Sequence, residues 1–241
     1  MTTPNQSLPR GSRPVFLLHG WSGSARTTWA PFHWNEELRN RGFNPHAVDL
    51  LGHGNAAAPH DPTAYADIAS HTARAFEGHE RVDVISFSMG AKITLALAAR
   101  MPHRFRRIVL SGVGENVFRP RTGRNGRRQH GTRLSDAVPA RVRDLAAMAF
   151  ASGNDVLALA ACMRRESTPI TRDEVAAIEI PVLIAVGDQD SIAGGDPLPL
   201  AAALPNATVI RLPGIDHVGT PYARDFRSAA IEFLAQDEEE T

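Results

Sequence analysis

The chain has 241 residues, 43% of them hydrophobic and 22% charged, and this composition is typical of a soluble globular protein that buries a sizeable core. Its 26 basic and 26 acidic residues cancel, so the chain lacks the net positive charge that would gather nucleic acid or an anionic membrane surface. No run of about 18 apolar residues could span a bilayer, and the opening segment has no apolar core of the kind a signal peptide needs. The single cysteine, Cys162, fits a reducing compartment, so we expect a cytoplasmic protein.

Short apolar runs alternate with helical patterns from residue 15 onward. The predicted strands lie within residues 15–18, 43–50, 81–88, 106–114, 180–190 and 207–214. The predicted helices lie near residues 34–42, 63–76, 89–101, 197–205 and 222–236. Strands that alternate with helices pair in parallel through right-handed crossovers. We therefore predict an α/β fold with a mostly parallel, doubly wound sheet of about six strands.

The alternation breaks after residue 112, where an arginine-rich loop is followed by helical patterns at about 136–151, 154–165 and 171–177. We interpret residues 113–178 as a helical insertion into a core made of residues 14–112 and 179–235. The first 13 residues are predicted to be disordered or extended. The acidic residues 236–241 are predicted to be a solvated tail.

The stretch "SFSMG" at residues 86–90 joins a predicted strand to a predicted helix. A serine at such a turn, with small residues two positions before and after it, forms the G-x-S-x-G nucleophile elbow. The frame centred on Ser88 places Ser86 and Gly90 at the small positions, whereas a frame centred on Ser86 would need a small residue in place of Val84. We therefore predict that Ser88 is the nucleophile and that Ser86 packs in place of a glycine.

Two later strand ends supply an acid and then a histidine, in the chain order that this elbow requires. "GDQD" ends at Asp190 after the fifth strand, and "DHVG" contains His217 after the sixth. His217 would take the proton of Ser88, and an acid would orient its imidazole. Asp188 is the alternative acid, but we expect it to be a turn residue that bonds its own backbone. Asp216 is expected to be a loop or capping residue.

These motifs, together with "HGW" after the first strand and "DLLGHG" after the second, make the chain similar to the α/β-hydrolase superfamily from about Val15 to Ala235. The resemblance implies a cofactor-free serine hydrolase with the α/β-hydrolase fold and a small helical cap over the nucleophile. It also favours Asp190, the last residue of a G-x-x-D pattern, as the acid of the triad. His19 in "HGW" is expected to be structural rather than a proton carrier.

An oxyanion requires two preorganised backbone donors near the nucleophile. One is expected to be the N–H of Met89, which follows Ser88 at the start of a helix. The resemblance places the other at the N–H of Trp21, in the loop after the first strand. No H-E-x-x-H, C-x-x-C or P-loop spacing occurs, so we expect neither a metal site nor a nucleotide cofactor.

The insertion carries six arginines and no acidic residue between positions 116 and 135. Arg127 and Arg128 are candidate contacts for an anionic group of the substrate. The alternative, which we prefer, is a solvated basic loop.

The predicted activity is hydrolysis of an ester or thioester of a small to medium acyl substrate through an acyl-enzyme on Ser88. A carbon–carbon hydrolase, a lyase or an acyltransferase with the same triad is the alternative, and a noncatalytic ligand-binding protein is a further one. The expected partner is a small-molecule acyl substrate, with no nucleic acid and no membrane span. The sequence does not indicate an oligomeric state.

Overall fold

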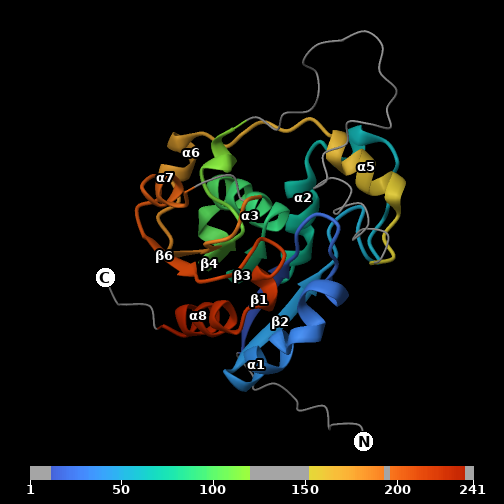
Figure 1. Ribbon diagram of the computed structural model, residues 1–241. Coiled ribbons are helices and arrows are strands. Elements are labelled where there is room, and N and C mark those ends of the chain that lie inside the picture. Colours follow the sequence, from blue (N-terminus) through green and yellow to red (C-terminus); the bar gives the residue numbers. More distant parts are fainter. Residues whose placement is uncertain (1–11, 120–151, 193–195, 237–241) are drawn as a thin grey trace, which may run out of the picture.

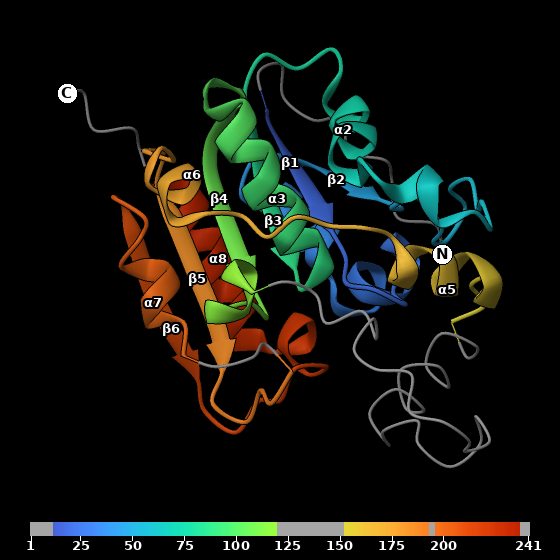
Figure 2. The same cartoon turned by 90° about the horizontal axis from the view of Figure 1, so that it is seen from above.

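The computed structural model describes residues 12–119, 152–192 and 196–236 (Figures 1 and 2). Its strands are β1 Arg13–Leu18, β2 Phe43–Val48, β3 Val82–Phe87, β4 Phe105–Ser111, β5 Val182–Gly187 and β6 Ala207–Leu212. Its α-helices are α1 Trp34–Asn40, α2 Ile68–Ala73, α3 Met89–Arg100, α5 Val156–Arg164, α6 Arg172–Ala176, α7 Leu198–Ala201 and α8 Arg224–Ala235. The short helical turns are η1 Ala25–Trp29, η2 Ala30–Phe32, η3 Pro62–Tyr65, η4 Arg74–Phe76, η5 Pro102–Arg104, η6 Glu115–Phe118 and η7 Thr220–Tyr222.

The six strands form one sheet in the order β2-β1-β3-β4-β5-β6, and every neighbouring pair is parallel. This confirms the predicted parallel sheet. The order reverses between β1 and β3, and ligands of open parallel sheets bind at the carboxyl ends of the strands at such a point. Pro45 lies within β2, which is an edge strand, the position in a sheet where a proline is tolerated.

Apolar side chains on the two faces of the sheet form two separate cores. Alternate residues of β1 show the division, because Phe16 and Leu18 belong to the core with α2 and α3, whereas Val15 and Leu17 belong to the core with α1 and α8. Figure 2 shows α3 crossing one face of the sheet and α8 crossing the other. The sheet is therefore doubly wound, as predicted.

The helix expected near residues 63–76 is divided into η3, α2 and η4. The division falls at Asp67, whose backbone leaves the helical region at φ −120° and ψ 61° and whose side chain accepts a hydrogen bond from the N–H of Ser70. A capping aspartate thus begins a new helix where the sequence pattern suggested a continuous one.

The region between β4 and β5 contains α5 and α6, close to two of the three helices expected there. Val175 and Ile178, at and just beyond α6, are buried in the core that also holds α3. The expected helix near residues 136–151 and both Arg127 and Arg128 lie outside the described residues, and the division into core and cap stays a prediction. Within the described ranges, no helix is long and apolar enough to cross a membrane.

Candidate active site

Ser88 lies at a sharp turn between the end of β3 and the first residue of α3. Its backbone has φ 52° and ψ −107°, a left-handed conformation that costs a non-glycine residue about 1–3 kcal/mol. Its N–H donates to the carbonyl of Ser111 at 2.8 Å, and its own carbonyl accepts from the N–H of Lys92 at 3.2 Å. These bonds to β4 and α3 hold the strained turn, and Ser88 lines a cavity near the sheet's carboxyl edge.

Gly90 allows α3 to approach the end of β1 closely. A Cβ at this position would lie 2.5 Å from the carbonyl oxygen of Leu18 and 2.7 Å from that of His19, and the N–H of Gly90 donates to His19 at 3.1 Å. Both obstacles are backbone atoms that cannot rotate away. Only glycine therefore fits at this position of the elbow, because any side chain would collide with the backbone of β1 and the loop after it.

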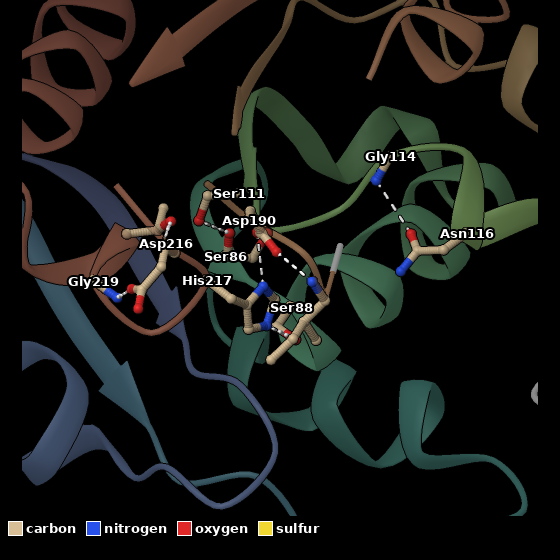
Figure 3. Close-up of polar contacts among 11 residues, drawn as sticks. Ser86, Ser88, Ser111, Gly114, Asn116, Asp190, Asp216, His217 and Gly219 are labelled. Carbon is tan, nitrogen blue, oxygen red and sulfur yellow. Dashed lines mark hydrogen bonds and ion pairs between the residues drawn. The ribbon is translucent and has the colours of Figure 1, made fainter. Parts of the chain in front are cut away.

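Ser86, the other serine of the motif, points away from the cavity into the sheet. Its side chain is fully buried, and its hydroxyl donates to the carbonyl of Val109 on β4 at 3.0 Å. Ser111 returns a similar bond to the carbonyl of Ser86 at 3.0 Å (Figure 3). The prediction that Ser86 packs is confirmed, and its contacts lie between β3 and β4.

The structure brings Ser88, His217 and Asp190 together in a row, although they lie far apart in the sequence (Figure 3). Nε2 of His217 is 3.0 Å from Oγ of Ser88, and Nδ1 is 2.8 Å from Oδ2 of Asp190. The other carboxylate oxygen of Asp190 accepts from the N–H of Ile192 at 2.9 Å. The carboxylate thus has a fixed orientation toward the imidazole.

The chemistry of these groups determines the tautomer of His217. An ionised carboxylate can only accept, so Nδ1 carries the proton that is donated to Asp190, and Nε2 is left as an acceptor for the Ser88 hydroxyl. The side chains of His217 and Asp190 are 8% and 0% exposed. A buried carboxylate in this position would stabilise a positive charge on the imidazole.

The two rival acids bond backbone groups instead. Asp216 accepts from the N–H of Gly219 at 2.7 Å and lies apart from the row of Ser88, His217 and Asp190, as Figure 3 shows, so its expected loop role is confirmed. Asp188 accepts from the N–H of Gly214 at 2.8 Å. The expectation that Asp188 bonds its own turn is wrong, because it instead joins the loop after β5 to the loop after β6.

Trp21 and Met89, the two expected backbone donors, both line the same cavity. Met89 is the first residue of α3, and a helix N-terminus leaves its first N–H groups without partners inside the helix. Within the described part of the chain, neither the Met89 nor the Trp21 N–H has a protein acceptor. Both are available as donors to a ligand.

His19 fixes the direction of the Trp21 N–H. Its Nε2 accepts from the N–H of Leu50 at 3.1 Å, so its Nδ1 carries the proton and donates to the carbonyl of Gly20 at 2.7 Å. In a trans peptide the carbonyl and the following N–H point in opposite directions, so holding the Gly20 carbonyl also holds the Trp21 N–H. Burial lowers the pKa of His19 to about 3, which keeps the neutral tautomer that this arrangement needs.

The cavity above Ser88 has a volume of about 490 Å³. Trp21, Phe87, Met163 and Tyr222 give it apolar walls, and Lys92 and Arg165 add positive charge. A second cavity of about 430 Å³ lies along α2 and α3 and shares Lys92, Asn116 and Arg165 with the first. Lys92 and Arg165 could not be predicted as cavity residues from the sequence, because only the fold brings the face of α3 and the end of α5 together.

No group of three or more His, Cys, Asp or Glu side chains that could hold a metal ion occurs among the described residues. Cys162 is buried, and its Sγ lies 3.8 Å from Sδ of Met89. Ser88 and His217, the latter bonded to Asp190, therefore lie at the same cavity as Lys92 and Arg165.

Comparison with known proteins identifies the family. The sequence matches the alpha/beta hydrolase family over residues 15–230, which is most of the chain. The chain therefore belongs to the alpha/beta hydrolase family, and the resemblance drawn from its motifs is confirmed.

Individual relatives are more distant. The chain is 36% identical over 103 residues to a 2-hydroxy-6-oxo-2,4-heptadienoate hydrolase of Pseudomonas putida, covering 42% of this chain and 37% of that protein. It is 33% identical over 111 residues to a pimeloyl-[acyl-carrier protein] methyl ester esterase of Neisseria meningitidis, covering 44% of this chain and 39% of that protein. The alignments thus span about two fifths of the length of these curated relatives.

Solved structures resemble the chain over nearly its full length. An enol-lactonase from Burkholderia xenovorans LB400 superposes with a TM-score of 0.72 at 20% identity, covering 94% of this chain and 92% of the lactonase. A thermophilic esterase from Thermogutta terrifontis gives a TM-score of 0.67 at 21% identity, covering 92% of this chain and 89% of the esterase. At these identities the similarity establishes the fold and leaves the reaction open.

Proposed function

We propose that the protein is a cofactor-free serine hydrolase that cleaves an ester or thioester through an acyl-enzyme on Ser88. The observation that carries the proposal is the continuous row of hydrogen bonds from Asp190 through His217 to Ser88, at 2.8 and 3.0 Å. Fold alone does not define a reaction. The reaction is indicated by three groups acting together: a nucleophile, a base within reach of its proton, and an acid that orients the base.

The first half of the reaction acylates the enzyme. Oγ of Ser88 attacks the carbonyl carbon of the substrate while Nε2 of His217 takes the hydroxyl proton, and Asp190 stabilises the resulting imidazolium. The carbonyl oxygen gains negative charge and accepts from the N–H groups of Met89 and Trp21. When the tetrahedral intermediate collapses, the bond to the leaving alcohol or thiol breaks, and His217 returns the proton to that group.

The second half restores Ser88. A water molecule donates a proton to the neutral His217 and attacks the acyl carbon, and the same two N–H groups hold the second oxyanion. Collapse breaks the ester bond to Oγ of Ser88, releases the acid and returns the proton from His217 to the serine. The protein therefore needs no redox partner and no cofactor for a complete cycle.

The cavity supports a small to medium acyl substrate. Its volume of about 490 Å³ falls in the range of sites that hold small organic ligands, and its walls are largely apolar. The esterase named among the relatives acts, by its name, on a methyl ester. An ester of a short or medium acyl chain is therefore the first substrate to test.

Carbon–carbon hydrolysis is the second candidate, and Arg165 and Lys92 at the cavity favour it. The Pseudomonas putida relative is named as a hydrolase of a dienoate, a carboxylate-bearing substrate. Guanidinium and ammonium groups are the usual partners of such a carboxylate. Under this alternative, Arg165→Met should raise KM far more for an acidic dienoate than for a neutral ester.

Activity on a panel of p-nitrophenyl esters and thioesters of increasing acyl length tests the proposal. We expect turnover of at least one member, with Ser88→Ala and His217→Gln each lowering kcat by about 10⁴-fold or more. The matched control is Asp216→Asn, which alters the carboxylate next to His217 in sequence and should leave kcat within a few-fold. Turnover of a carbon–carbon substrate alone would replace the proposal by the second candidate, and full activity of Ser88→Ala would reject both.

A further inference from the structure

The loop that carries the Trp21 N–H is a tight turn from Gly20 to Gly23. The N–H of Gly23 donates to the carbonyl of Gly20 at 3.1 Å, and Ser22 has a left-handed backbone with φ 69°. Such a conformation is unfavourable for serine and persists only where surrounding contacts hold it. His19 holds the Gly20 carbonyl at the start of this turn, so the strained Ser22 end needs a support of its own.

Asn154, just before α5, supplies that support from a distant part of the chain. Its side-chain amide donates to the carbonyl of Ser22 at 2.8 Å and to that of Gly23 at 3.3 Å. It also donates to the hydroxyl of Ser152 at 2.6 Å, and Ser152 itself donates to the carbonyl of Ser22 at 3.0 Å. The left-handed residue of the turn is thus held by two side chains of one segment.

The other end of the Asn154 side chain is also bonded. Its carbonyl oxygen accepts from the N–H of Gly54 at 2.7 Å, so the residue joins the loop after β2 to the turn after β1. Asn154 is only 8% exposed. A buried amide with both its donor and acceptor satisfied is a rigid connection, because breaking either bond leaves an unpaired polar group.

A further bond from the same turn reaches α5 itself. Nε1 of Trp21 donates to the carbonyl of Leu159 at 3.2 Å. Residues 152–159 therefore contact the turn at both its backbone and the side chain of its candidate donor residue. A shift of residues 152–159 would therefore also shift the turn that carries the Trp21 N–H.

We propose that Asn154 is a positioning residue that sets the geometry of the oxyanion hole, so that docking of residues 152–159 on the core controls the rate of acyl transfer. The inference rests on the proposed function. Asn154 touches no reacting atom, and it acts through the Ser22 and Gly23 carbonyls on the turn that presents the Trp21 N–H. Its loss should affect the transition state more than substrate binding, because the oxyanion forms only during reaction.

The test compares Asn154→Ala and Asn154→Asp with the matched control His60→Ala on the ester that the wild-type protein hydrolyses best. Asn154→Asp keeps the acceptor for Gly54 but loses the donors to the turn. His60→Ala removes the 2.9 Å pair between His60 and Asp155, a second tether of the same segment that does not touch the turn. We expect both Asn154 variants to lower kcat by about 10- to 100-fold with KM within about threefold, and His60→Ala to change kcat less than threefold.

A boronic acid inhibitor, which forms a tetrahedral adduct on a serine, provides the second readout. Its affinity should weaken in the Asn154 variants in proportion to kcat and stay near the wild-type value in His60→Ala. If Asn154→Ala fails to fold, Asn154→Asp and Ser152→Ala are measured instead. Ser152→Ala should also lower kcat, but by a smaller factor. Unchanged kcat in Asn154→Asp, or an equal loss in His60→Ala, would overturn the inference. Retained activity in Ser88→Ala would instead reject the proposed function itself.

Discussion

At the scale of single residues, two serines two positions apart have opposite surroundings because the strand ends in a sharp turn between them. Residues two positions apart on a continuing strand would instead share one face of the sheet. Ser86 still belongs to β3 and is buried against β4, whereas Ser88 lies beyond the strand at a left-handed turn beside the cavity. The hydroxyl of Ser86 bonds the carbonyl of Val109, and that of Ser88 lies against His217. Their chemistry is therefore decided by backbone geometry.

Ser86→Gly is expected to retain kcat within a few-fold and to lower the free energy of unfolding by about 1–2 kcal/mol, because it removes one buried hydrogen bond and adds backbone freedom. Ester hydrolysis and urea denaturation measure the two effects. Ser111→Ala is the matched control, since it removes the reciprocal hydroxyl-to-carbonyl bond between the same strands. Complete loss of activity in folded Ser86→Gly would mean that Ser86, and not Ser88, belongs to the reacting machinery.

Chain order and strand ends were sufficient to select Ser88 and His217, because they bring such residues to one edge of a parallel sheet. The choice of Asp190 over Asp188 came from the resemblance to the α/β-hydrolase superfamily. The sequence could not reveal Asn154. In the sequence Asn154 is one polar residue before a helix, and Asp155 next to it is the actual cap of α5. Its importance comes from contacts with residues 100 or more positions away, which local patterns do not encode.

At the scale of elements, an ion pair joins the start of β3, the start of β4 and the end of α8. Asp83 accepts from Nη2 of Arg106 at 2.6 Å and from the N–H of Arg107 at 3.2 Å, and Arg106 also donates to the carbonyl of Leu234 at 2.6 Å. The Asp83 and Arg106 side chains are 1% and 10% exposed. The pair lies at the opposite end of β3 from Ser88, so it stabilises the packing of α8 without touching the cavity.

Asp83→Ala should therefore reduce the free energy of unfolding by about 3–5 kcal/mol, because it leaves the Arg106 charge buried without a partner. Urea denaturation measures this loss. Glu36→Ala breaks the exposed pair with His33 and should cost less than about 1 kcal/mol. The kcat of folded Asp83→Ala should equal that of the wild type, and a small stability loss equal to that of Glu36→Ala would contradict the assigned role.

Element prediction from the sequence succeeded where hydrophobic periodicity was strong and failed where a local cap intervened. The six strands and the helices α3 and α8 lie where apolar runs and helical patterns indicated them. The helix near residues 63–76 is divided because the side chain of Asp67 competes for a backbone N–H, and the turn η1 was not predicted at all. At η1 the side chain of Ser24 accepts a hydrogen bond from the N–H of Thr27 and caps the turn. Such local side-chain bonds cannot be read from the spacing of apolar residues.

At the scale of the whole molecule, the loops after β1 and β2 meet around two buried histidines, His19 and His53, whose rings lie 5.2 Å apart. Burial lowers the pKa of His19 to about 3 and that of His53 to about 4. Both imidazoles are therefore neutral in the folded protein at pH 7, whereas in the unfolded chain they would take up protons below about pH 6.5. The folded state binds fewer protons than the unfolded state between about pH 6.5 and 4.

The stability contributed by these two histidines is fully present above about pH 6.5 and is lost as the pH falls toward 4. Each neutral histidine adds a slope on the order of 1.4 kcal/mol per pH unit in that window. Urea denaturation at intervals between pH 7 and pH 4.5 should show His53→Gln with a shallower decline of the free energy of unfolding than the wild type. Equal slopes for the two proteins would show that His53 is not buried as a neutral group.

The central claim is that Ser88 is an activated nucleophile, and covalent labelling with a fluorophosphonate tests it most directly. The probe should modify one residue of the intact protein, mass spectrometry of the digested protein should place the adduct on Ser88, and Ser88→Ala should abolish labelling. Asp216→Asn should label at the wild-type rate, whereas His217→Gln should label far more slowly because the base is lost. An adduct on any other residue, or equal labelling of Ser88→Ala, would contradict the account.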